Sequence, residues 1–137
     1  MKQFEYFDVT ADIGFKAYGE NLSEAFENAG LAIFNIISNT CDVKPSKEIS
    51  FEITSQDNVA MLYDFLEELL FYHEVDFMLF SEFDVEIYEN FRLKATIKGE
   101  SFDFSKHERK SEIKAITFHK MEVSDTNPAR VQAIVDL

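Results

Sequence analysis

The sequence contains one cysteine, no tryptophan and only four glycines among its 137 residues. Cys41 has no partner for a disulfide within the chain, which is compatible with a reducing compartment, and we expect it to be a small buried or half-buried residue. The glycines are too scattered to form a phosphate-binding loop. No Cys or His pair has the spacing of a zinc site, and no serine lies in a nucleophile-elbow context. The sequence therefore does not support a self-sufficient hydrolase or transferase.

Positive charge is also scarce. Thirteen Lys and Arg stand against 26 Asp and Glu, so the formal net charge is −13. Proteins bind nucleic acid largely through Lys and Arg that displace counterions from phosphates, which argues against direct RNA binding by this chain. The acidic balance permits a basic protein partner or bound cations, and it also serves solubility.

Long apolar runs are absent. No window approaches the ~20 apolar residues that span a bilayer, and the opening residues MKQFEYFDVT contain no apolar run of signal-peptide length. We therefore expect a soluble, cytoplasmic protein without membrane contact. At this length, with 46% apolar residues, the chain should form a single domain over residues 1–137 around its own core.

Apolar periodicity predicts an α+β fold. Helical spacing predicts two helices, over residues 22–37 and 59–73, with Asn21 and Glu24 forming a capping box before the first. Alternation of apolar and polar residues predicts strands near residues 4–6, 15–17, 49–53, 83–87, 93–97, 113–123 and 131–135. Residues 99–110 are polar and typical of turns. The expected architecture is a largely antiparallel β-sheet covered by two α-helices.

Carboxylates occur at both ends of the chain. Asp8 and Asp12 flank the first predicted turn, and Asp136 precedes Leu137, which carries the α-carboxylate. If the last strand ended beside the first turn, several oxygens would converge, and hard cations such as Ca²⁺ and Mg²⁺ prefer such ligands. Spacing alone leaves open the simpler interpretation, in which these are solvated acidic termini.

The remaining candidates have both structural and functional interpretations. Lys114 and His119 lie in the longest strand candidate, and each is compatible with an ordinary strand position or a functional role. The apolar run over residues 78–83 is favoured as core over an exposed partner-binding patch.

Six blocks in order along the chain resemble the archease family. Val9-Thr10-Ala11-Asp12-Ile13-Gly14 is similar to the family's opening, which usually reads His-Thr-Ala-Asp-(Ile/Val)-Gly. Glu112-Ile113-Lys114-Ala115-Ile116-Thr117-Phe118-His119 resembles its most distinctive strand. The other four blocks lie at residues 17–26, 62–70, 98–107 and 133–137. The chain departs from the family pattern at Val9, which replaces the usual His, and at Phe65 and Val131, where Trp is common.

The resemblance implies an accessory protein and not an enzyme. Archeases assist RNA ligases of the RtcB type, which act in tRNA splicing and form a histidine–GMP intermediate from GTP. They promote this guanylylation and support multiple turnover. The resemblance further implies a divalent metal, usually Ca²⁺, at Asp12, Asp136 and Leu137, with Asp8, Lys114 and His119 as further functional candidates and with RNA contacted only through the ligase.

Two other functions remain open from the sequence. One is a small metal-dependent phosphatase or nuclease that uses the same carboxylates. The other is a chaperone-like interaction protein that acts through apolar surface without a metal. The first would hydrolyse RNA or nucleotide on its own, and the second would suppress aggregation of unrelated proteins without metal.

Overall fold

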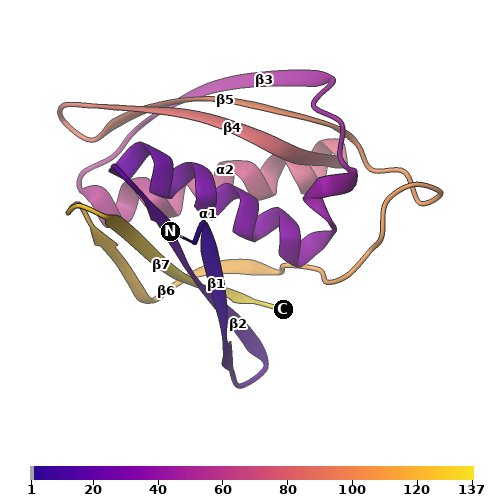
Figure 1. Cartoon of the computed structure of the whole chain (residues 1–137), viewed down its shortest axis with the longest axis horizontal. Coiled ribbons are helices and arrows are strands. Elements are labelled where there is room, and N and C mark those ends of the chain that lie inside the picture. The colour runs from indigo at the N-terminus through magenta and orange to yellow at the C-terminus, as the bar shows by residue number, and fades with distance from the viewer. Residues whose placement is uncertain (1) are drawn as a thin grey trace.

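Two α-helices lie between two antiparallel β-sheets in the computed structural model, which describes residues 2–137 (Figure 1). The four-stranded sheet has the order β1-β2-β7-β6 and contains β1 (Phe4–Val9), β2 (Asp12–Gly19), β6 (Ala115–Ser124) and β7 (Ala129–Asp136). The three-stranded sheet has the order β3-β5-β4 and contains β3 (Lys47–Thr54), β4 (Met78–Tyr88) and β5 (Arg92–Ser101). The helices are α1 (Leu22–Ile37) and α2 (Asn58–Asp76). The predicted α+β class is confirmed.

The strands form two sheets where the sequence predicts one, and the composition of α1 explains the difference. Eleven of its sixteen residues are buried, including Phe26, Ile33 and Phe34. A helix that is apolar around most of its circumference needs cover on opposite sides. One sheet covers each side of the helical layer, and the core lies within that layer.

The starts of both helices follow from side-chain caps. The Asn21 side chain accepts a hydrogen bond from the Glu24 backbone N–H, as the predicted capping box requires, whereas the Glu24 carboxylate reaches the backbone N–H of Glu20. Asp57 accepts from the Ala60 N–H at the start of α2. Helix α2 ends at Phe77, whose backbone is left-handed at φ 56.

Three local predictions are wrong or shifted. Strand β4 begins at Met78, five residues before the predicted strand, and Met78, Leu79 and Phe80 are core residues as favoured. Strand β5 continues to Ser101, so the polar segment expected from residue 99 begins as a strand. Cys41 is exposed in the short 3₁₀-helix η1 (Thr40–Asp42), because its polar turn lies outside the helical layer.

Strand alternation places Asp12 and its partner Asp136 on the outer face of the four-stranded sheet. On β2, Phe15 and Ala17 are fully buried toward the helices. Side chains at alternate positions, including Asp12, therefore point away from the helical layer. No helix within residues 2–137 is both long and apolar enough to cross a membrane.

Candidate functional site

Asp12 and Asp136 face each other across the central pair of strands. Backbone pairing aligns Val9 with Asp12, Asp12 with Asp136, and Asp136 with Ala115, so one row crosses β1, β2, β7 and β6. Directly opposed residues of antiparallel strands have Cβ atoms about 4.5–5.5 Å apart and share one face. The start and the end of the described chain thus bring two carboxylates together.

The hairpin that carries Asp12 is set by a tight turn and a close ring contact. Strands β1 and β2 are joined by Thr10 and Ala11, and Ala11 adopts a left-handed backbone at φ 64. Two rows away from Asp12, the Phe7 ring lies over Gly14, where an added Cβ atom would be 2.2 Å from the ring carbons. The glycine therefore lets β1 close tightly over β2 beside the carboxylate row.

Neither carboxylate is paired with a cationic side chain of the described residues. Asp12 is half-buried and Asp136 is exposed, and neither forms an ion pair with another residue of the segment 2–137. Two adjacent anionic groups without a counter-charge repel each other, and a hard cation relieves that repulsion. The donor set is chemically suited to a calcium-like ion.

The number of side-chain donors is small. Within the described residues, no group of three or more His, Cys, Asp or Glu side chains is arranged to hold a metal. A third ligand would have to come from main-chain oxygen. Leu137 follows Asp136 directly in the chain, and its side chain packs against the core. The residues therefore fit a site completed by main-chain oxygens and by solvent or a partner.

The other sequence candidates take different places. Asp8 is exposed and pairs with Ile13, so alternation turns its side chain away from the face of Asp12. The Lys114 backbone N–H donates to the Asp136 carbonyl oxygen at 2.7 Å, which puts Lys114 beside the row with an exposed side chain. His119 is exposed in an irregular part of β6 and does not join the row.

That irregularity was not foreseen from the sequence. The register of β6 against β7 shifts between Thr117 and Glu122, and Lys120 has a left-handed backbone at φ 54. The buried Gln132 side chain supports it by donating to the Lys120 carbonyl at 2.8 Å and to the Glu122 carboxylate at 2.9 Å. No turn residue marks a bulge here, so the alternation of residues 113–123 predicted a continuous strand.

A buried histidine fixes the segment that connects the two sheets. His107 accepts a hydrogen bond at Nδ1 from the Asp103 N–H, so Nε2 carries the proton that is donated to Glu100 at 3.0 Å. The Glu100 carboxylate also accepts from Lys106 Nζ at 2.6 Å and from the Lys44 N–H at 2.7 Å. This hydrogen-bond network fixes the start of the connecting segment, residues 102–114. The other end of that segment is bonded to Asp136 through Lys114.

Glu100 should make the stability of the fold depend on pH in the acidic range. Desolvation raises its pKa, but the bonds from Lys106, Lys44 and His107 outweigh this and lower the pKa to about 2 from an ordinary 4.5. A lowered native pKa gives a contribution that is complete above the ordinary value and declines as the pH falls from 4.5 toward 2. We expect the stability advantage of the wild type over Glu100→Gln to shrink between pH 6 and pH 3. Urea unfolding at both pH values measures this, and an unchanged difference would contradict the assignment.

The fold and the carboxylate row define a small acidic α+β protein in which the first hairpin and the last strand bring Asp12 and Asp136 onto one face of a sheet. Residues 4–137 match the Archease protein family, and the chain belongs to that family. It is 49% identical to protein archease of Methanothermobacter thermautotrophicus, with both chains covered completely. It is 44% identical to protein archease of Sulfurisphaera tokodaii over 91% of each chain, and 42% identical to that of Pyrococcus furiosus over 90% of this chain and 89% of the relative.

A solved structure supports the same conclusion. The solution structure of Methanobacterium thermoautotrophicum protein 1598 superposes with a TM-score of 0.88 at 49% identity, and all of each chain is covered. The resemblance inferred from six sequence blocks is confirmed.

Proposed function

We propose that this protein activates an RNA ligase of the RtcB type by promoting its guanylylation and its multiple turnover, and that it has no complete active site of its own. Family membership supports a role of this kind. The observation that supports the proposal is the cross-strand pairing of Asp12 with Asp136, which brings two carboxylates together on the central strands of the four-stranded sheet.

In this proposal, Asp12, Asp136 and the main chain of Leu137 hold a divalent cation, most simply Ca²⁺. A bound cation of this kind would supply positive charge to phosphate oxygens of the nucleotide. The chain contributes a rigid mount, since both aspartates belong to paired strands and the Asp136 carbonyl is fixed by the Lys114 N–H. An incomplete set of protein ligands leaves coordination positions for groups of the ligase or of GTP.

Charge also suits the proposed partner. A ligase that handles RNA and GTP should present a basic active-site face, and this chain carries a net charge of −13. Complementary charge speeds encounter, and it weakens with added salt. The same charge argues that RNA is reached only through the ligase.

Multiple-turnover ligation tests the proposal. With ligase present at a small fraction of the RNA ends, the wild-type chain should raise the number of ligations per ligase molecule above that of the ligase alone. The same RNA and GTP incubated with the chain alone should stay intact, whereas hydrolysis lost in Asp12→Ala would favour the phosphatase or nuclease function. An unchanged ligation yield would contradict activation.

The position of Val9 leads to a prediction about which cation the site prefers. It lies directly opposite Asp12 in the row, at the position where the family opening usually has His. Val9→His would add an imidazole beside the two carboxylates. Borderline metals bind imidazole well and Ca²⁺ prefers oxygen, so we expect affinity for Mn²⁺ or Zn²⁺ to rise on the order of tenfold while Ca²⁺ affinity changes little. Calorimetric titration of each ion measures this; an equal gain for Ca²⁺ would contradict it.

A further inference from the structure

A chain of aromatic rings lies where α2 ends and β5 leads into the connecting segment. Phe77 contacts Phe102 with centroids 6.2 Å apart, and Phe102 contacts Phe104 at 4.8 Å. Phe77 is 54% exposed and Phe104 is 68% exposed, whereas Phe26, Phe34 and Phe80 are buried in the core. Such a cluster of exposed rings marks an interaction surface more often than isolated apolar residues do.

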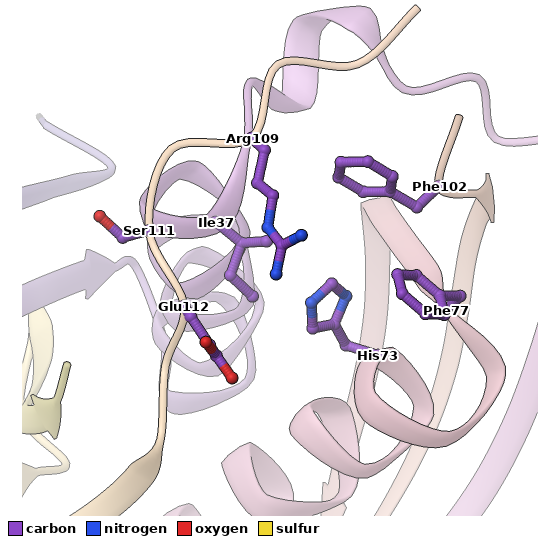
Figure 2. A pocket seen from close by; sticks show the side chains of 7 residues that line it. All are labelled: Ile37, His73, Phe77, Phe102, Arg109, Ser111 and Glu112. Atoms are coloured by element: carbon purple, nitrogen blue, oxygen red, sulfur yellow. The ribbon is translucent and has the colours of Figure 1, made fainter. Parts of the chain in front are cut away.

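Two of these rings, Phe77 and Phe102, line a small pocket beside the end of α1. Figure 2 shows the Arg109 guanidinium between Ile37 and His73, and Phe77 and Phe102 lie on the same side of it as His73. The guanidinium lies 6.0 Å from the centre of the Phe104 ring. Within residues 2–137 it forms no ion pair, so its donors are available to an outside acceptor.

The pocket is built on fixed backbone. On one side of Arg109, the Glu108 carbonyl accepts from Ser38 Oγ at 2.6 Å; on the other, the Lys110 N–H donates to the Ile37 carbonyl at 2.9 Å. The Phe102 N–H donates to the Phe77 carbonyl at 2.7 Å. Aromatic and Arg side chains held in this way lose little entropy on binding and dominate the energetics of protein interfaces.

The pocket and the carboxylate row are close enough to belong to one interface. Arg109 and Lys114 are the two ends of a short segment, and Lys114 is bonded to Asp136. Five residues span at most roughly 17 Å. An interface of standard size buries about 800 Å² of each partner, which is enough to include both features.

We infer that this pocket is the anchor point for the ligase, and that an apolar side chain of the ligase packs against the exposed rings at its rim with a carboxylate beside it. The inference rests on the proposed function. The rings and Ile37 suit the apolar group, and the free Arg109 guanidinium suits a carboxylate, which it can bind through two parallel hydrogen bonds. A nucleic acid is disfavoured, because Arg109 is the one Lys or Arg among the described lining residues and the whole chain is strongly acidic.

Separate measurements of ligase binding and of ligase guanylylation distinguish the anchor proposal from the proposed function. Phe104→Ala and Arg109→Glu should each raise the dissociation constant for the ligase at least about tenfold, measured by calorimetry or interferometry. Stimulation of guanylylation should return when these variants are added to saturation. Asp12→Asn should fail to stimulate even when it is added to saturation. Phe91→Ala is the matched control, because this 39% exposed ring lies at the β4–β5 turn, at the opposite end of β4 from Phe77.

The possible outcomes distinguish the anchor proposal from the proposed function. Wild-type affinity for the ligase in both Phe104→Ala and Arg109→Glu would overturn the anchor proposal. A wild-type chain that binds through the pocket without stimulating the ligase would leave the anchor standing and reject activation, and absence of any binding would overturn both. Sedimentation of the chain alone is the last check: a wild-type dimer that Phe104→Ala converts to monomer would assign the pocket to self-association instead.

Discussion

Asp12→Asn is expected to reduce ligase guanylylation to the rate of the ligase alone. The substitution keeps the size of the side chain and removes one of the two charges that face each other between β2 and β7. Since like charges directly opposed on neighbouring strands are destabilising, the variant should be as stable as the wild type or slightly more so, within about 0.5 kcal/mol. Single-turnover labelling of the ligase with radioactive GTP measures the rate.

Asp8→Asn is the control for this result. It removes the same charge from the same hairpin, but Asp8 lies on the other side of β1 from the carboxylate row. We expect it to stimulate like the wild type. Equal loss in the two variants would mean that net charge near the turn matters and that the Asp12–Asp136 pair does not.

Gly99→Ala is expected to destabilise the protein by at least about 3 kcal/mol, since overpacking of this severity exceeds the usual range. A Cβ atom at this position would lie 1.8 Å from the Leu79 carbonyl oxygen and 2.7 Å from the Phe80 Cα. Both are backbone atoms of the paired strand β4, so no side-chain rotation relieves the contact. Thermal and urea unfolding measure the loss, which is a large part of the stability of an ordinary domain.

Gly14→Ala is the matched comparison. The same added methyl group meets the ring of Phe7, which is a side chain at the surface of the sheet and can move aside. We therefore expect a clearly smaller loss. If both alanine variants lost the same stability, the distinction between backbone and side-chain contacts would be wrong.

The sequence predicted the elements well where one physical signal dominated. The apolar stripe of residues 22–37 and the cap at Asn21 fixed α1, and alternation located most strands. Periodicity does not report how many sides of a helix are covered, so the division into two sheets was missed. The early start of β4 was missed because Met78, Leu79 and Phe80 are all buried and show no alternation.

The candidate site was predicted in part. Acidic residues near both ends suggested a meeting of Asp12 and Asp136, and the register of β2 with β7 provides it. Asp8 could not be excluded beforehand, because its side of the strand depends on a two-residue turn. The pocket around Arg109 was missed entirely, since its members come from α1, α2 and the connecting segment and share no local motif. Only the folded chain places them together.

Titration of the isotopically labelled protein with Ca²⁺, followed by amide NMR, tests the central claim most directly. The account predicts saturable shifts confined to the region where the β1–β2 turn lies beside the end of β7: residues 9–13, Asp136, Leu137 and the Lys114 amide that is bonded to Asp136. These shifts should vanish in Asp12→Asn. A spectrum that does not respond to Ca²⁺, or one that responds equally in the variant, would contradict the proposed cation site.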